Sequence, residues 1–422
     1  MSTHPFLKHT GHGARGGRLL AAGSLLGLLG ALASCHWGAH YTVGTIFVPN
    51  SIAVADVNAD GAPDLLVATT ADEGSGNNPG FANVILNSAG SRGTFHTGVQ
   101  YPTTGDNPSS IAVADLTHSG SLDLVVANSA SGSVSVYMHG ASPGTFKSAV
   151  NVITGGVPNQ VVIGDLNGDG RPDLVVADMS ASGNAIVLLA DPASPGQFLA
   201  PVSLATGAVT TSAAIGDLNG DGLPDIVAAT SDSNGNNGAV YVFYQDPASR
   251  GSFLPAVKFP AGAQPQSVKI ADVNGDGLPD IIVANLGPGS DGTGAAGVSV
   301  LLQDAAHPGQ FLAAVTYATA GSSVDVAVGD LNGDGKPDLV VANLDPAPTG
   351  SVSVLLQDPS HAGVFLAASD YSGFGQPLGV AIADLNGDGH PDVAVADSTT
   401  ATVMLQDPSA PGTFSPPVQV GN

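Results

Sequence analysis

The stretch DLNGDGRPD, Asp165–Asp173, carries four side-chain oxygen donors around a central glycine: Asp165, Asn167, Asp169 and Asp173. Three carboxylates this close together repel one another strongly when nothing lies between them. Ca²⁺ takes six to eight oxygen ligands in flexible geometry, and alternating Asp and Asn with a Gly for the sharp turn supplies them from a short loop. The stretch therefore predicts a calcium-binding loop.

The same loop recurs along the chain. A weaker copy, DLTHSGSLD at Asp115–Asp123, keeps the carboxylates at its two ends but has Thr117 and Ser119 at the middle ligand positions. An EF-hand loop would carry a bidentate Glu at position twelve, whereas every copy here has Val or Ala there, in runs such as DLVVAN. Such runs are typical of strands, so each loop is predicted to be a hairpin connection. The other full copies are Asp56–Asp64, Asp217–Asp225, Asp272–Asp280, Asp330–Asp338 and Asp384–Asp392.

The spacing of the loops predicts the fold. First Asp to first Asp, the intervals are 59, 50, 52, 55, 58 and 54 residues, a period typical of propellers, solenoids or arrays. The unit Val324–Tyr371 reads as four strands: VDVAVGD, DLVVAN, SVSVLLQD and a last strand beyond Phe365. Four strands in each of seven repeats predict an all-β protein, a seven-bladed β-propeller of four-stranded blades over residues 50–422.

Two residue patterns favour a propeller over a solenoid. The first strand of every repeat is built of small residues, as in SIAVAD and SAAIGD, which suits the crowded strands nearest a propeller axis. A Gly-x-Phe motif recurs in every outer hairpin, and we expect its phenylalanines to pack between blades. They are Phe95, Phe146, Phe198, Phe253, Phe311, Phe365 and Phe414.

Composition excludes several classes of protein. Among the 422 residues, 57 are Gly and only 11% are charged, which argues against long helices. The formal net charge of −25 argues against nucleic acid as a partner, because phosphate binding needs Lys and Arg. The seven loops hold 20 of the 35 acidic residues, so the charge has a local origin that bound Ca²⁺ would reduce.

Residues 1–34 are predicted to be a signal peptide. Three basic residues precede the apolar stretch Leu19–Leu32, which is too short to span a bilayer and suits a signal peptide. The segment ends in LASC, which resembles a bacterial lipobox and makes Cys35 the predicted lipidation site. The protein would then be anchored by lipid to the bacterial cell envelope, at the outer membrane or cell surface; with an ordinary signal peptide it would be secreted. Residues 35–49 would link the anchor to the fold, and Tyr41–Val48 could pair with blade seven and close the ring.

The repeats resemble the FG-GAP/VCBS family, which includes the seven-bladed head of integrin α chains and certain fungal lectins. The resemblance covers about residues 50–422 and implies a propeller with Ca²⁺ in the hairpin between the first and second strands of a blade. It implies about six Ca²⁺ sites, and leaves the second loop in doubt. The implied ligands are Asp56, Asn58, Asp60 and Asp64; Asp165, Asn167, Asp169 and Asp173; Asp217, Asn219, Asp221 and Asp225; Asp272, Asn274, Asp276 and Asp280; Asp330, Asn332, Asp334 and Asp338; and Asp384, Asn386, Asp388 and Asp392.

These features are compatible with three functions. The first is a monomeric, calcium-stabilised surface module that binds or scaffolds a protein or polysaccharide ligand. The second is a lectin, although aromatic residues are only 5% of the chain and most tyrosines fall in strands. The third, an extracellular hydrolase or lyase, is disfavoured because the histidines fall singly and no Ser-His-Asp or Cys-His arrangement stands out, so we predict no catalytic residue.

The partner is expected on the face opposite the calcium loops. The connections between second and third strands emerge there, and they are long in blade one (Thr69–Phe81), blade four (Thr230–Gly238), blade five (Asn285–Gly297) and blade six (Asn343–Gly350). Long irregular loops on a rigid scaffold are common binding sites. Tolerated insertions are the alternative explanation of their length.

Overall fold

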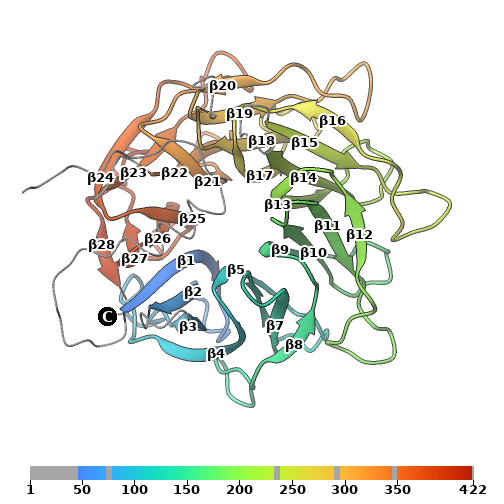
Figure 1. Cartoon of the computed structure of the whole chain (residues 1–422). Helices are drawn as coiled ribbons and strands as arrows, with labels where there is room; N and C mark the ends of the chain where they lie inside the picture. The colour runs from blue at the N-terminus through green and yellow to red at the C-terminus, as the bar shows by residue number, and fades with distance from the viewer. Residues whose placement is uncertain (1–45, 73–77, 232–237, 289–294, 345–348, 421–422) are drawn as a thin grey trace, which may run out of the picture. The chain divides into compact units, whose positions relative to one another are not determined.

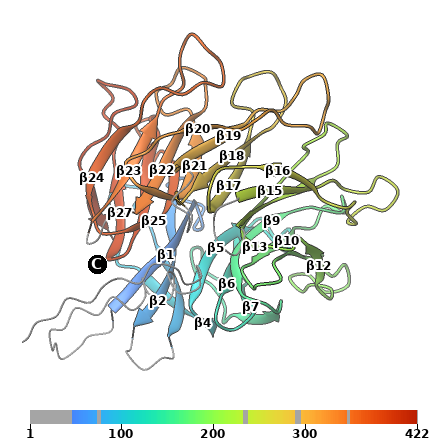
Figure 2. The same ribbon diagram turned by 45° about the horizontal axis from the view of Figure 1, so that its top comes forward.

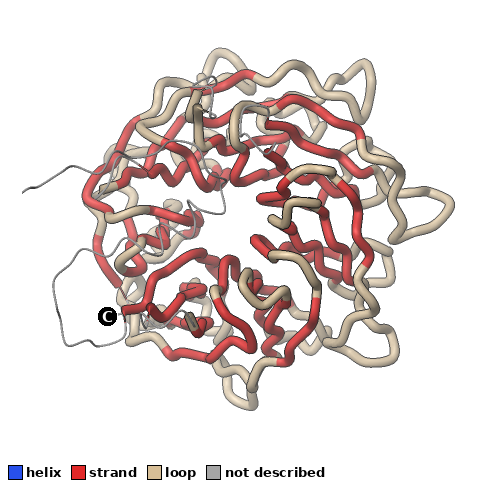
Figure 3. Tube along the Cα trace, in the orientation of Figure 1, coloured by secondary structure: helices blue, strands red, loops and turns tan. Residues whose placement is uncertain are grey.

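The computed structural model describes residues 46–72, 78–231, 238–288, 295–344 and 349–420, and these ranges contain strands and turns but no helix (Figure 3). The chain divides into Met1–Cys35 and His36–Asn422, and every described residue belongs to the second unit. The predicted signal peptide and Cys35 lie outside the described residues. None of the described segments forms a helix long and apolar enough to cross a membrane.

The strands follow the chain in groups of four. Blade one holds β1 (Ile46–Ala55), β2 (Asp64–Asp72), β3 (Pro79–Ile85) and β4 (Val99–Asp106); blade two β5 (Pro108–Ala114), β6 (Asp123–Asn128), β7 (Ser133–Tyr137) and β8 (Val150–Ile153); blade three β9 (Pro158–Gly164), β10 (Asp173–Asp178), β11 (Asn184–Leu188) and β12 (Val202–Ala205). Blade four holds β13 (Val209–Gly216), β14 (Asp225–Ser231), β15 (Gly238–Phe243) and β16 (Val257–Pro260); blade five β17 (Pro265–Ala271), β18 (Asp280–Asn285), β19 (Gly297–Leu301) and β20 (Val315–Tyr317). Blade six holds β21 (Ser322–Gly329), β22 (Asp338–Leu344), β23 (Gly350–Leu355) and β24 (Ser369–Phe374); blade seven β25 (Pro377–Ala383), β26 (Asp392–Asp397), β27 (Thr400–Met404) and β28 (Val418–Val420).

Each group forms one antiparallel sheet, and the seven sheets stand around a common axis (Figure 1). The first strand of each sheet is innermost, and the tilted view shows the same ring of inner strands (Figure 2). The predicted seven-bladed β-propeller of four-stranded blades is therefore confirmed.

Small residues at the axis have a steric cause. A side-chain carbon at Gly164 would lie 3.1 Å from Ile215 of the next blade, and one at Gly216 would lie 3.1 Å from Ile270. Contacts this short leave no room for a larger side chain. The second strands of blades two, three and five are buried along their whole length, as their continuous apolar runs predict.

The core consists of seven clusters, one at each junction between neighbouring blades. The cluster between blades one and two, for example, joins Leu66 and Val84 to Leu124 and Phe146. Each cluster contains one phenylalanine of the Gly-x-Phe motif. The predicted packing role of these residues is confirmed, and the ring is held together by apolar contact between blades.

The expectation that Tyr41–Val48 pairs with blade seven is wrong for the residues that the structure describes. Ile46, Phe47 and Val48 belong to β1 and pair with β2 inside blade one. Blade seven is completed by its own β28. The physical reason is that these apolar residues continue the strand Ser51–Ala55 through a single bulge, so the whole stretch stays in one sheet. Residues 41–45 lie outside the described residues.

Candidate functional site

The acidic loops connect the first and second strands of each blade, as predicted. In blade three, Asp165 accepts hydrogen bonds from the backbone N–H groups of Gly168 and Gly170, each at 2.8 Å. Asn167 Oδ1 accepts from the N–H of Asp169 at 2.8 Å. Gly170 has φ +85°, a conformation that favours glycine. The loop therefore curls around its own side-chain oxygens.

The last aspartate of the loop differs from the others because it is fully buried. Both carboxylate oxygens of Asp173 accept backbone N–H bonds, from Leu166 at 2.8 Å and from Ala190 at 2.7 Å. Burial raises the pKa of Asp173 to about 6, and the nearby charges of Asp169 and Asp165 raise it further against the effect of the hydrogen bonds. The same burial raises the pKa to about 6 at Asp64, Asp225, Asp280, Asp338 and Asp392.

The donors of these loops suit a hard cation, because all are carboxylate or amide oxygens. A cation would also offset the negative charge of the three carboxylates that each full loop carries. However, within the described ranges no three His, Cys, Asp or Glu side chains lie close enough to form a ready cluster for a metal ion. In the arrangement seen here the oxygens are instead satisfied by N–H groups of their own loop, as Asp165 illustrates.

The second loop is satisfied by protein groups alone. Asp115, although partial burial would raise its pKa, is held at a lowered pKa by the backbone N–H groups of Gly120, Ser119 and Thr117. Its buried Asp123 accepts the N–H of Leu116 at 3.0 Å and, on its other oxygen, a bond of 2.8 Å with Nδ1 of His139. The equivalent position in other blades is Asn, Ala or Gln, so a histidine beside the buried carboxylate is particular to blade two.

Neighbouring loops are joined by a side chain at the end of the third strand. Gln357 Nε2 donates to the carbonyl of Val273 in the preceding loop at 2.7 Å and to that of Pro337 in its own loop at 3.0 Å. Gln245, Gln406 and Asn87 make the same pair of bonds in blades four, seven and one. The recurrence of Gln before Asp-Pro was the available signal for this role, which the motif analysis missed.

The Gly-x-Phe turns lie on the same face as the acidic loops, as expected from the order of the strands. The N–H of Gly144 donates to the carbonyl of Val57 in the loop of the preceding blade at 3.1 Å. A side-chain carbon at Gly251 would lie 3.1 Å from Cβ of Asn167. Each turn thus covers the loop of the blade before it. The centres of the long connections proposed for partner binding, residues 73–77, 232–237, 289–294 and 345–348, lie outside the described residues.

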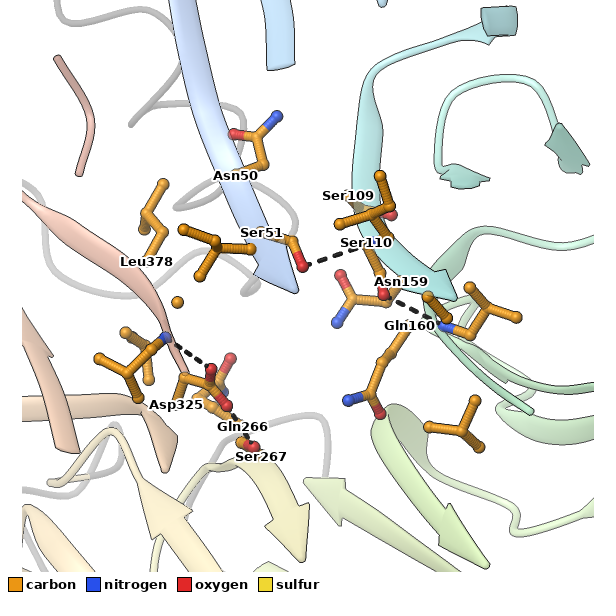
Figure 4. A pocket seen from close by; sticks show the side chains of 18 of the residues that line it. Asn50, Ser51, Ser109, Ser110, Asn159, Gln160, Gln266, Ser267, Asp325 and Leu378 are labelled. Atoms are coloured by element: carbon orange, nitrogen blue, oxygen red, sulfur yellow. Dashed lines mark hydrogen bonds between the residues drawn. The ribbon is translucent and has the colours of Figure 1, made fainter. Parts of the chain in front are cut away.

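A second candidate site is a pocket on the propeller axis, with a volume of about 400 Å³ (Figure 4). It is lined by the inner strands of all seven blades, and sequence reasoning missed it because these residues lie a whole repeat apart. The inner strand of each blade has a β-bulge, and every bulged residue lines the pocket. They are Asn50, Ser109, Asn159, Thr211, Gln266, Val324 and Leu378.

The tyrosines of the ring mainly serve packing. Tyr101, Tyr317 and Tyr371 each make an edge-to-face contact with a Gly-x-Phe phenylalanine of the next blade, with ring centroids 5.4–5.8 Å apart. Tyr137 is fully buried, and burial raises its pKa strongly. None of the described residues that line the axial pocket is aromatic.

Comparison with known proteins identifies the repeat. The model of the FG-GAP-like repeat matches residues 56–126, 117–176, 165–228, 217–283, 286–341 and 330–395, which is most of the chain. No curated protein matches it.

Solved structures share the propeller. Two proteins provisionally named 6-phosphogluconolactonase, from Bacteroides uniformis and Bacteroides fragilis, are 14% and 15% identical to this chain, with TM-scores of 0.52 and 0.54. The first match covers 82% of this chain and 94% of the other, and the second 91% and 97%. A protein from Lactobacillus plantarum is 15% identical with a TM-score of 0.51, covering 88% of this chain and 94% of its own. At these identities the likeness concerns the fold alone.

Proposed function

Since the chain belongs to the FG-GAP-like repeat family, we propose that it is a calcium-stabilised propeller, anchored at the cell surface, that binds or scaffolds a protein or glycan partner. The family and the fold support a general binding or scaffold role. The observation that carries the calcium proposal is that each of six loops places two further carboxylates and an amide oxygen near a buried aspartate. Negative charge repeated six times on one face calls for a cation.

Each full loop would hold one Ca²⁺ through the four side chains already assigned to it. The ion would supply charge neutralisation and would fix the turn between first and second strands. Because the bonds of Gln357 and its equivalents join neighbouring loops, stabilising one loop should also stabilise the adjoining blade. The second loop would stay empty, since Thr117 and Ser119 stand at its middle ligand positions and His139 lies beside its buried Asp123.

The remaining parts of the proposal rest on the sequence. Lipidation of Cys35 would place the propeller on the outer membrane or cell surface, and an ordinary signal peptide would release it instead. We expect no catalytic activity. The histidines at the outer turns, His307 and His361, pair with the aspartate three residues before them, which suits a role in the turn.

The partner is proposed to bind the face opposite the calcium loops. The structure determines which residues of the blade-five connection can be replaced in a test of this proposal. Asn285 is fully buried and donates to Ser299 Oγ at 2.9 Å, and it pairs with Gly297 across the hairpin. Both residues must be kept, so the segment to replace with a short turn is 287–296.

The decisive experiment measures metal and partner capture on the same protein. Metal analysis should give about six Ca²⁺ per chain, and calcium at 100 times its dissociation constant should add about 2.7 kcal/mol per site to the free energy of unfolding. A melting temperature that is identical with calcium and after its removal would refute the calcium proposal. Replacing 287–296 should leave metal content unchanged but weaken capture of surface components. Unchanged capture after this replacement and the matching ones in blades four and six would place the partner elsewhere.

A further inference from the structure

The bulged residues give the axial pocket two chemically different sides. Blades one to five contribute the polar side chains Asn50, Ser109, Asn159, Thr211 and Gln266, whereas blades six and seven contribute Val324 and Leu378. A bulge redirects a side chain, and here it does so at the same level in every blade. Because the inner strands run toward the acidic loops, this ring of bulges lies toward the opposite face, where the proposed function places the partner.

Several polar groups in the pocket are held in place yet keep free hydrogen-bonding capacity. Nδ2 of Asn159 donates to the carbonyl of Thr211 at 2.6 Å, and Oε1 of Gln160 accepts the N–H of Ala213 at 2.8 Å. Asn159 Oδ1 and Gln160 Nε2 have no protein partner in the described part of the chain, and both side chains project into the space between the inner strands (Figure 4). One acceptor and one donor are therefore fixed and available, together with Asn50, whose Nδ2 is bound to Pro108 O and whose Oδ1 is free among the described residues.

A single ion pair lies in the lining. Lys269 Nζ is 3.6 Å from Asp325 Oδ1, and both side chains are partly exposed. Asp325 also accepts from Ser267 Oγ at 2.7 Å and from the N–H of Val380 at 3.0 Å.

The packing of the ring does not require these two charges. In blade two, Ile111 is the equivalent of Val380, and its N–H donates to the hydroxyl of Ser51. An uncharged side chain can therefore accept this hydrogen bond. The position of Lys269 is Ala in five of the other inner strands and Val in the sixth. A paired ammonium and carboxylate in a ring of small residues therefore point to a ligand.

We propose that the axial pocket binds a neutral saccharide ring. Hydroxyl groups donate and accept, so they can pair with the carboxylate of Asp325, the ammonium of Lys269 and the free amide groups. The C–H face of the sugar would pack on Val324 and Leu378. An anionic ligand is disfavoured by the carboxylate and by the net charge of −25, and a cationic one by Lys269. The volume of about 400 Å³ lies within the range of small-molecule sites. This inference deepens the proposed binding role and rests on it, but requires neither calcium nor the lipid anchor.

The test measures binding of glucose, galactose and mannose to the full-length protein by saturation-transfer NMR and calorimetry, with gluconate as an anionic probe. At least one neutral hexose should bind, and gluconate should bind more weakly. Lys269→Ala introduces the residue that most inner strands already have, and Asp325→Asn keeps an acceptor for Val380. Each should weaken hexose binding about tenfold or more without lowering the melting temperature. Lys258→Ala is the matched control, because Lys258 is on the outer strand β16, away from the pocket. Its ammonium lies over the ring of Tyr241.

The outcomes separate this inference from the general function. Hexose binding that is lost in Lys269→Ala and kept in Lys258→Ala supports the pocket. Binding of no hexose, tighter binding of gluconate, or equal binding by both lysine variants overturns it. If no hexose binds while the wild-type protein still captures surface components, the pocket inference fails and the scaffold role stands. If a hexose binds through Lys269 but no component is captured, the scaffold role fails and the pocket stands.

Discussion

Lowering the pH from 7 to 5 should stabilise the metal-free protein, which is the opposite of what acid does to most proteins. Burial raises the pKa of six aspartates, including Asp225, from the ordinary 3.8 to about 6. A group whose pKa is higher in the folded state binds its proton more tightly there than in the unfolded chain. The folded state is therefore less stable when the pH is above the folded pKa, and it gains stability as the pH falls below that value. For these pKa values each carboxylate adds roughly 1 kcal/mol to the free energy of unfolding when the pH is lowered from 7 to 5.

The six groups lie in separate blades, so their contributions should add to about 6 kcal/mol. For a domain of this length that corresponds to a rise in melting temperature of roughly 10 °C. With saturating Ca²⁺ the sign reverses, because the metal holds the carboxylates ionised and lowers their pKa in the folded state. Protons then compete with the metal, and stability falls as the pH decreases through the lowered pKa.

Calcium must be removed from the protein before the measurement, and the buffers must be calcium-free. A chelator cannot be used for this during the measurement, because chelators bind Ca²⁺ more weakly at acid pH. Thermal unfolding is then followed by circular dichroism at several pH values, with and without added Ca²⁺. Asp225→Asn should remove roughly 1 kcal/mol of the gain on acidification. Asp246→Asn, on an outer turn of the same blade, is the matched control. A metal-free protein that loses stability between pH 7 and 5, or two variants with the same pH response, would refute the reasoning.

Three further predictions concern the ring and its anchor. Phe365→Ala should cost about 3–5 kcal/mol in denaturant unfolding because Phe365 fills the cluster between blades five and six, and a cost below about 1 kcal/mol would contradict the packing role. Gln357→Ala should cost about 1–3 kcal/mol, since the carbonyls of Val273 and Pro337 lose their donor; an unchanged midpoint would show that the bond between loops contributes little. Cys35→Ala should lose the acyl label and leave the membrane fraction, and a variant that still sediments with membranes would be held by something other than this lipid.

The fold could be predicted because each repeat contains the residue patterns of all four strands of its blade. The run DLVVAN cannot be exposed on either side, and the small residues around Gly164 and Gly216 fit only a crowded axis. The start of the first inner strand was misjudged because the bulge at Asn50 interrupts the pattern on which strand predictions depend. A proline stands before the bulge in five of the seven blades, and this signal could have shown that the strand continues through it.

The candidate site could be predicted only in part. The loop donors are local, so Asp165 and its neighbours were found from nine consecutive residues. Sequence spacing does not show burial, however, and the loop pattern gives no hint that Asp173 is enclosed while Asp165 is not. The axial pocket was out of reach, because Lys269 and Asp325 meet only after two blades have folded and docked.

The ring closes without exchanging a strand, and this has a consequence for how such a protein can change. Every blade is a complete sheet made from four consecutive strands of the chain. The junction between blades seven and one is held by the same kinds of contact as the other six junctions. Asn87, for instance, reaches from blade one to the carbonyl of Leu385 in blade seven at 2.7 Å, as Gln357 does between blades six and five. Whole blades can therefore be duplicated or replaced without changing the path of the rest of the chain. The axial pocket changes with each replacement, because every blade brings its own bulged residue to the centre.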